Sequence, residues 1–186
     1  MSLFNGIKKS IGSSLCRSIA ESSKVVRLAV NFEDAKRVGI IYDATDPERF
    51  EIVKEYAKDI RESGKEVKAL GFVNDKQTGR NQMPTIDLDF FTLRDLNWYF
   101  KPSGHTIKNF INGDHDILIC LDMEGCLPLQ FIAGSSKAKY RVGKYDLKNQ
   151  SYYDLMIDLQ KNENLSYFIE QVNHYINLIN KKEDAG

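Results

Sequence analysis

The sequence has few of the residues that mark several protein classes. Its 186 residues include 3 Cys, 4 Pro and 1 Trp, and 26 Lys and Arg balance 26 Asp and Glu. Three cysteines are too few for a disulfide scaffold, and an odd number favours a reducing compartment. Zero net charge argues against a protein that coats nucleic acid, so we expect no nucleic-acid partner. An apolar content of 42% is too high for a disordered chain.

Long hydrophobic runs are also absent. No run approaches the roughly 18 apolar residues of a membrane-spanning helix, and the N-terminus lacks the apolar core of a secretory signal. The sequence therefore predicts a cytoplasmic protein, with contact at a membrane surface as the alternative. A single domain of this length buries roughly 70% of its unfolded surface, so no metal or disulfide is needed for folding.

The first 22 residues show apolar side chains at helical spacing. These recur every three or four residues and predict one apolar face of a helix. The apolar residues of this face are Leu3, Phe4, Ile7, Ile11, Leu15 and Ile19. Lys8, Lys9 and Arg17 are the only charged residues before Glu21. Two interpretations remain open: a basic amphipathic helix that binds an anionic membrane or a protein partner, and a helix that packs on its own domain or on a second copy.

The rest of the chain alternates short apolar runs with helical patterns. Strands are predicted at residues 38–43, 67–73, 86–90, 116–122, 140–143 and, at an edge, 152–157. Helices are predicted at residues 47–60, 104–110, 127–133 and 164–179. This alternation predicts an α/β fold: a single three-layer Rossmann-like domain with a mostly parallel sheet and an amphipathic N-terminal helix. We assign residues 1–30 to a helical extension, 31–182 to the domain and 183–186 to a tail.

Nucleotide and metal motifs are absent from the expected places. No glycine-rich phosphate loop follows an apolar strand, and His105, His115 and His174 lie on separate predicted elements. The sequence predicts no cofactor and no metal. Residues 74–85 form a long polar segment of the kind that often serves as a lid or a binding loop.

Two acidic residues mark the ends of the most apolar strands. Asp43 and Asp122 should reach the carboxyl edge of the sheet, where ligands bind in open α/β folds. The candidate ligand-binding residues are Asp43, Thr45, Asp46, Asp122, Glu124, Gly125 and Cys126. Either these acids bind a ligand, one of them acting as a base, or each caps the helix that follows. Cys126, near a predicted helix start, is also a candidate nucleophile.

Aromatic residues cluster in one short segment. The cluster comprises Phe90, Phe91, Trp98, Tyr99 and Phe100. It either belongs to the core or forms a stacking wall or partner-docking patch. The candidate contact residues for a partner or a membrane are Phe4, Ile7, Lys8, Lys9, Ile11, Trp98 and Tyr99.

Two resemblances follow from longer segments. The first involves three successive segments: DILICLD, the helix with Leu129, Ile132 and Ala133, and AKYRVG. Together they resemble the N-terminal Rossmann-like half of heptosyltransferase-type glycosyltransferases. The second involves four segments: IIYDATDPERFEIV, KALGFV, DLNWYF and YDLMIDLQKNENLSYFIEQVNHYINLI. These are similar to a family of small Bacteroidetes proteins of unknown function. The first resemblance implies a sugar-binding fold, but the loop DATDPE replaces the Gly-Asp loop of those enzymes. The second implies a fold and a source without a reaction.

Two functions are consistent with these observations. The first is a non-catalytic binding or protein-interaction module, with the N-terminal helix joining a second copy, a protein partner or a membrane surface. The second is a small glycosyltransferase-like or sugar-binding enzyme whose nucleotide-sugar donor domain lies on another protein. Whether the protein is an enzyme is open at this level.

Overall fold

A six-stranded parallel sheet forms the centre of the protein. The computed structural model describes residues 3–75 and 87–179. The strand order is β3-β2-β1-β4-β5-β6, and every neighbouring pair is parallel. The strands are β1 (Arg37–Asp43), β2 (Glu66–Val73), β3 (Leu88–Thr92), β4 (Ile117–Leu121), β5 (Tyr140–Lys144) and β6 (Leu155–Ile157). The helices are α1 (Leu3–Glu21), α2 (Pro47–Glu62), α3 (His105–Ile111), α4 (Leu127–Ser135) and α5 (Leu165–Leu178). The predicted Rossmann-like α/β fold is confirmed.

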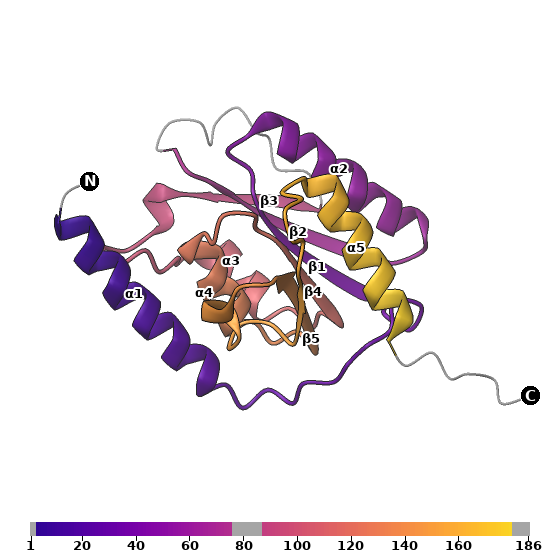
Figure 1. Cartoon of the computed structure of the whole chain (residues 1–186), viewed down its shortest axis with the longest axis horizontal. Helices are drawn as coiled ribbons and strands as arrows, with labels where there is room; N and C mark the ends of the chain where they lie inside the picture. The colour runs from indigo at the N-terminus through magenta and orange to yellow at the C-terminus, as the bar shows by residue number, and fades with distance from the viewer. Residues whose placement is uncertain (1–2, 76–86, 180–186) are drawn as a thin grey trace, which may run out of the picture.

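Helices cover both faces of the sheet. Figure 1 shows α2 and α5 on one side, and α1, α3 and α4 on the other. Successive side chains of a strand point to opposite faces, so Ile40 and Tyr42 of β1 join the core under α2 and α5. Ile41 lies between them in sequence and joins the core under α1, α3 and α4. Burial on both faces explains why β1 and β4 are almost wholly apolar.

Local sequence signals set the ends of α2. The Asp46 carboxylate caps the helix by accepting a hydrogen bond from the Glu48 amide at 2.8 Å, and Pro47 occupies the first turn, where a missing N–H costs nothing. Gly64 follows the helix with a φ of 85°, a left-handed conformation that favours glycine. The two strands and the helix predicted within residues 38–73 are confirmed.

The third strand begins later than its sequence pattern predicts. β3 starts at Leu88, whereas Ile86 lies outside the described residues, as does most of the polar segment predicted as a lid or binding loop. The predicted edge strand is shortened to Leu155–Ile157 and does lie at the edge, paired with β5.

Small residues bring α1 close to the domain. Gly12, Cys16 and Ala20 are buried and face α4 and the segment before α3. A Cβ at Gly12 would clash with the carbonyl oxygen of Tyr99 and lie 2.9 Å from Leu127. The helix ends at Glu21, so the remainder of the predicted helical extension to residue 30 is not helical.

The connection from α1 to β1 is hydrogen-bonded to the residues that precede β4 and β5. Figure 1 shows it crossing the lower edge of the molecule. The Leu28 amide donates to the Lys139 carbonyl oxygen at 3.0 Å. The Asp116 carboxylate accepts from the amides of Lys36 and Arg37, and from Lys139 Nζ at 2.7 Å. Burial raises the pKa of Asp116, but these donors outweigh it and bring the pKa to about 2.

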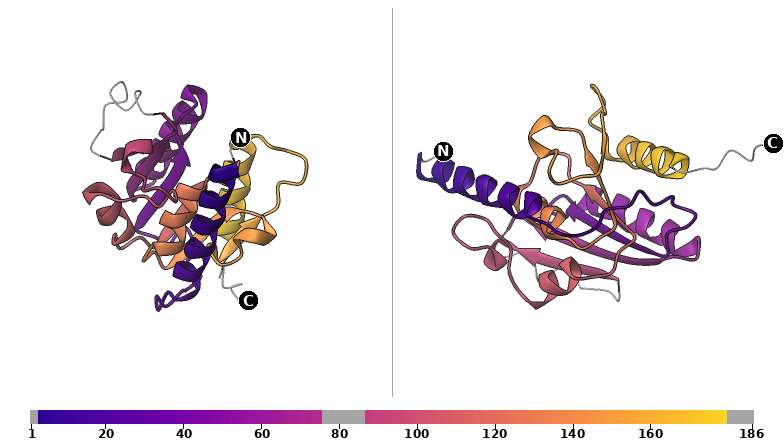
Figure 2. Two further views of the ribbon diagram at one scale, coloured as in Figure 1. Left: turned by 90° about the vertical axis from the view of Figure 1, so that its left-hand side faces the viewer. Right: turned by 90° about the horizontal axis from the view of Figure 1, so that it is seen from below.

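The first turns of α1 project beyond the rest of the domain (Figure 2). Gly6 has nothing within 4 Å of where a Cβ would lie, in contrast to Gly12. No helix within residues 3–75 and 87–179 is long and apolar enough to span a bilayer.

The two glycines of α1 should respond oppositely to substitution. Gly12→Leu should lower the free energy of unfolding by about 1–3 kcal/mol, because the larger side chain forces α1 away from Tyr99 and Leu127. Gly6→Ala should raise helix stability by up to about 1 kcal/mol, because alanine favours the helix and meets open space. Urea unfolding of both variants measures this. A tolerated leucine at Gly12 would contradict the packing of α1.

Candidate functional site

The carboxyl edge of the sheet has its topological switch point between β1 and β4. β2 and β3 lie on one side of β1, whereas β4, β5 and β6 lie on the other. Ligands of open α/β sheets bind at such a point, outside the carboxyl ends of the strands. Asp43 ends β1 and Asp122 directly follows β4. Because β1 and β4 are paired in parallel, both acids reach the same part of the carboxyl edge.

The carboxylate of Asp122 is hydrogen-bonded within the loop that follows β4. Its carboxylate is buried and accepts hydrogen bonds from the amides of Glu124 at 3.0 Å, Gly125 at 3.1 Å and Cys126 at 2.6 Å. Burial raises the pKa of Asp122, and the three amides act in the opposite direction. Gly125 supports the turn with a φ of 76°. The carboxylate thus holds the loop that leads into α4.

The side chains of Asp43, Thr45 and Asp46 also accept hydrogen bonds from backbone amides of the chain. Asp43 Oδ1 accepts from the Thr45 amide at 2.9 Å, and Thr45 Oγ1 accepts from the Asn74 amide at 2.9 Å. Asp46 caps α2. The N-termini of α2 and α4 are where this class of fold would hold a phosphate. Both already have a carboxylate of the chain beside them, Asp46 and Asp122, which opposes binding of a second anion.

An ion pair joins the two loops across the switch point. Arg49 Nη1 on α2 lies 3.0 Å from Glu124 Oε1, and Arg49 Nε lies 4.0 Å from Asp46 Oδ2. All three side chains are at least partly exposed, so solvent screens the pairs and their effect on stability is small.

A groove of about 550 Å³ opens on one side of the 122–126 loop. We call it the switch-point groove. Its charged lining residues are Lys9 of α1, Asp43 and Glu124, and Gly125 and Cys126 line it as well. Its apolar lining consists of Phe72, Leu93, Leu96, Phe100, Leu127 and Pro128. The groove is therefore apolar over most of its wall and charged where α1 meets the carboxyl edge.

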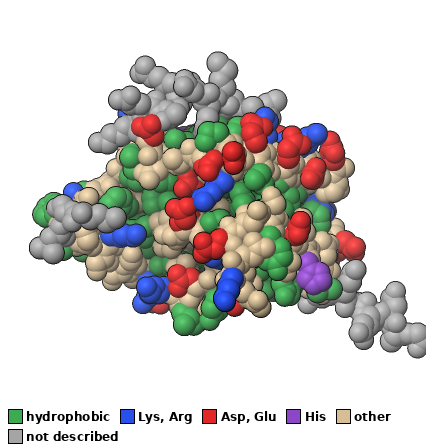
Figure 3. All heavy atoms as spheres, turned by 45° about the horizontal axis from the view of Figure 1, so that its top comes forward, with side chains coloured by type: hydrophobic (Ala, Val, Ile, Leu, Met, Phe, Trp, Pro, Cys, Tyr) green, Lys and Arg blue, Asp and Glu red, His purple; other side chains and the backbone are tan. Residues whose placement is uncertain are grey.

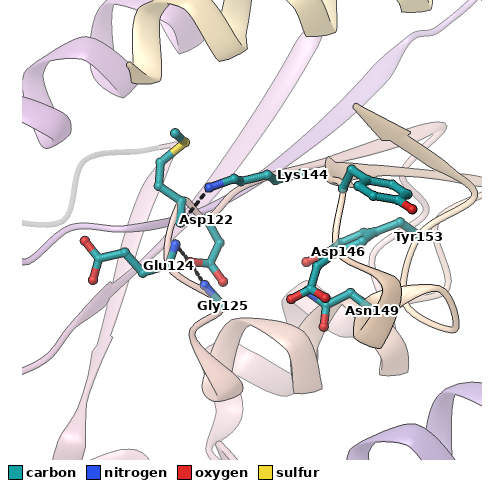
Figure 4. Close-up of a pocket in the computed structure, with 9 residues that line it drawn as sticks. Asp122, Glu124, Gly125, Lys144, Asp146, Asn149 and Tyr153 are labelled. Atoms are coloured by element: carbon teal, nitrogen blue, oxygen red, sulfur yellow. Dashed lines mark hydrogen bonds between the residues drawn. The ribbon is translucent and has the colours of Figure 1, made fainter. Parts of the chain in front are cut away.

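A smaller cavity, about 250 Å³, lies on the other side of the same loop (Figure 4). Lys144 reaches across it and donates through Nζ to the Met123 carbonyl oxygen at 2.9 Å. Asp122, Asp146 and Asn149 also line it. Its wall is mostly polar, in contrast to the groove.

The two cavities divide the residues chosen from the sequence. Asp43 and Cys126 line the groove, Asp122 lines the smaller cavity, and Glu124 and Gly125 line both. Thr45 and Asp46 line neither. Neither cavity is therefore lined by all seven candidate residues, because the 122–126 loop stands between the two.

The aromatic cluster is divided between core and surface. Phe91 is buried, and Phe90, Tyr99 and Phe100 are half-buried against the two cores. Trp98 is 57% exposed and meets the Tyr99 ring edge-on, with the centroids 5.0 Å apart.

Most of the large apolar side chains described in α1 point away from the domain. Phe4, Ile7, Ile11 and Leu15 are exposed, whereas Ile19 packs partly against the core. Lys8 Nζ lies 4.8 Å from the centre of the Phe4 ring. We call Phe4, Ile7, Ile11 and Leu15 the α1 stripe.

A family model described as a family of unknown function, DUF6913, matches residues 7–179. The chain belongs to this family. Neither the curated proteins nor the solved structures that were compared include a match. The family model covers the domain and all but the first turn of α1, so the close-packed Gly12–Cys16–Ala20 side of α1 lies within the family unit.

Sequence reasoning missed the lining residues that come from the end of β5 and from the β3–α3 and β5–β6 connections. Leu93, Leu96, Lys144 and Asn149 carried no motif. The apolar residues have the pattern of ordinary core residues. Lys144 ends the short strand β5 and Asn149 follows it, and no acidic residue ends this strand. Only the fold brings these connections to the edge where β1 and β4 end.

The thiol considered as a nucleophile should be unreactive. Burial, and next the nearby Asp122 carboxylate, raise the pKa of Cys126 well above that of a free thiol. Burial likewise raises the pKa of Cys16 to about 12. We expect iodoacetamide at pH 8 to label both slowly in the folded protein and rapidly in guanidinium, as measured by mass spectrometry. Fast, selective labelling of folded Cys126 would restore it as a candidate nucleophile.

Proposed function

We propose that this protein is a non-catalytic binding module that attaches to a negatively charged membrane surface through α1. The observation that carries the proposal is the orientation of this helix. Its small residues, Gly12, Cys16 and Ala20, face the domain, whereas the α1 stripe faces solvent. The exposed fractions of the stripe range from 39% at Leu15 to 66% at Phe4.

An outward apolar stripe on a helix is costly in water and is typical of a contact surface. The hydrophobic effect would ordinarily turn Phe, Ile and Leu toward the core. Here the close approach at Gly12 prevents that, because a large side chain on that side would clash with Tyr99. The stripe therefore needs a partner outside the domain.

Charge favours an anionic partner over a second copy. α1 carries Lys8, Lys9 and Arg17, and its single acid is Glu21 at its last residue. Lys8 lies beside the stripe, 4.8 Å from the centre of the Phe4 ring. Two α1 helices packed stripe to stripe would bring this charge near its copy, whereas anionic lipid headgroups would attract it. Because the whole chain is neutral, the remainder is slightly acidic. On the face in Figure 3, acidic side chains over α2 are interspersed with basic ones. The difference in net charge between α1 and the remainder would orient α1 toward the membrane.

Trp98 supports a membrane surface. It is the single tryptophan of the chain and is largely exposed. The next residue, Tyr99, forms the close contact with Gly12 of α1. Tryptophan beside an exposed apolar helix is typical of the membrane–water interface, where its ring lies at headgroup level.

The acids at the switch point support a role without catalysis. Asp46 and Asp122 hold helix N-termini, and Glu124 pairs with Arg49. A general base must reach a substrate proton, and these carboxylates are directed at the chain itself.

Vesicle sedimentation tests the attachment. The wild-type protein should sediment with phosphatidylglycerol-containing vesicles more than with phosphatidylcholine vesicles, and salt should weaken the binding. Ile7→Ser with Ile11→Ser should weaken it roughly 10- to 30-fold, because two exposed apolar side chains no longer enter the interface.

The matched control is Val26→Ser with Leu28→Ser, which removes exposed apolar side chains outside α1. It should bind as the wild type does. Equal loss in both double variants, or no sedimentation of the wild type, would refute the proposal. A change in the sedimentation coefficient of the Ile7 and Ile11 variant without lipid would instead identify a second copy as the partner.

The competing proposal is a sugar-binding or glycosyltransferase-like enzyme that lacks its own donor domain. One observation favours it: the smaller cavity is lined by the exposed carboxyls of Glu124 and Asp146 beside Lys144. Carboxylates and amines of this kind hold sugar hydroxyls by hydrogen bonds.

Thermal shift measurements discriminate between the two proposals. An enzyme of this kind should be stabilised by a nucleotide sugar or a phosphosugar, with the shift growing with ligand concentration. Asp146→Asn, at the exposed rim of the smaller cavity, should then reduce the shift. The absence of stabilisation at millimolar ligand would count decisively against this enzyme.

A further inference from the structure

The switch-point groove has the place and size of a ligand site. It opens at the carboxyl ends of β1 and β2, beside the loop after β4, where α/β folds of this topology bind ligands. Its volume of about 550 Å³ lies within the range of roughly 300–1,000 Å³ that is usual for small-molecule sites. Helix α1 forms one wall through Asn5, Gly6 and Lys9.

The apolar part of the groove would accept a hydrocarbon chain. Phe72, Leu93, Leu96 and Phe100 line it, with Leu127 at the start of α4. These side chains come from three separate segments of the chain, so the apolar surface is continuous only in the folded protein. A hydrocarbon chain on this surface would remove apolar area from water on both sides.

The charged part of the groove contains both signs. Of the groove's three charged residues, Glu124 is paired with Arg49 at 3.0 Å, and the other two are Lys9 and Asp43. Neither forms an ion pair with another of the described residues. Asp43 uses Oδ1 for the Thr45 amide. One cation and one anion in the same groove complement a head group that is itself zwitterionic.

The chemistry of the edge excludes ligands with several phosphates. Asp46 and Asp122 already stand at the N-termini of α2 and α4, so a nucleotide would meet carboxylates where it needs amides. A ligand with a single anionic group beside Lys9 would avoid both of these carboxylates.

From this geometry we infer that the switch-point groove binds a zwitterionic amphiphile with a single alkyl chain. Its chain lies on Leu93, Leu96 and Phe100, its cationic group meets Asp43, and its anionic group meets Lys9. This binding is distinct from attachment through the α1 stripe, which points away from the domain.

Three probes with the same 12-carbon chain test the head-group preference. They are dodecylphosphocholine, dodecyl phosphate and dodecylamine, each titrated below its micelle concentration. The fluorescence of Trp98, which lies two residues from both Leu96 and Phe100, reports binding, and a thermal shift confirms it. The zwitterionic probe should bind at least fivefold more tightly than either charged probe.

Gly6→Phe and Ser10→Phe form a matched pair. Gly6 lines the groove and has open space around it, so phenylalanine there should fill the groove and weaken dodecylphosphocholine binding at least tenfold. Ser10 is exposed on the same helix and does not line the groove, so its variant should bind as the wild type does. Asp43→Asn, whose amide oxygen can still accept from Thr45, should weaken the zwitterionic and cationic probes but not dodecyl phosphate.

Three results would overturn the inference. The first is equal binding of all three probes, which would show a non-specific apolar surface. The second is equal binding by the Gly6 and Ser10 variants, which would place the probe elsewhere. The third is loss of probe binding in the double variant Ile7→Ser with Ile11→Ser, which would assign the binding to the α1 stripe. The vesicle experiment is independent of these outcomes, so either proposal can fail alone.

Discussion

A parallel sheet with two buried faces imposes the main constraint on this protein. The backbone groups of β1 and β4 pair within the sheet, and their side chains are apolar on both faces. Such a sheet is stable only when helices cover both faces. α2 and α5 cover one face, while α3, α4 and part of α1 cover the other. One side of α1 is therefore part of the hydrophobic core.

The packing of α1 against this core decides which face of the helix stays exposed to solvent. Close packing requires small side chains where backbones approach, and Gly12, Cys16 and Ala20 supply them. The larger apolar residues at other angles around the helix are then directed outward. The same placement gives the switch-point groove one of its walls, because the first turns of α1 extend past Gly12 over the carboxyl edge of the sheet. One packing contact thus produces both surfaces for which we propose a role.

Much of the fold could be predicted from the sequence because the signals are local. Continuous apolar runs marked β1 and β4, and Asp46, Pro47 and Gly64 marked the limits of α2. The apolar spacing of the first 22 residues marked α1, but did not show which side of the helix would be buried. Hydrophobicity suggested the Phe4–Ile7–Ile11 side, whereas steric access at Tyr99 and Leu127 selects the side of Gly12.

The sequence by itself determined the α/β class, the helices and strands that carry it, and the arrival of Asp43 and Asp122 at one edge of the sheet. These follow from residue periodicity, helix caps and the rule that parallel strands end together. Only the tertiary structure decided that β1 and β4 are neighbours, that the 122–126 loop separates two cavities, and that α1 leaves its stripe in solvent. Those features depend on contacts between residues far apart in the chain, such as Gly12 with Tyr99 and Arg49 with Glu124, and no local pattern encodes such contacts.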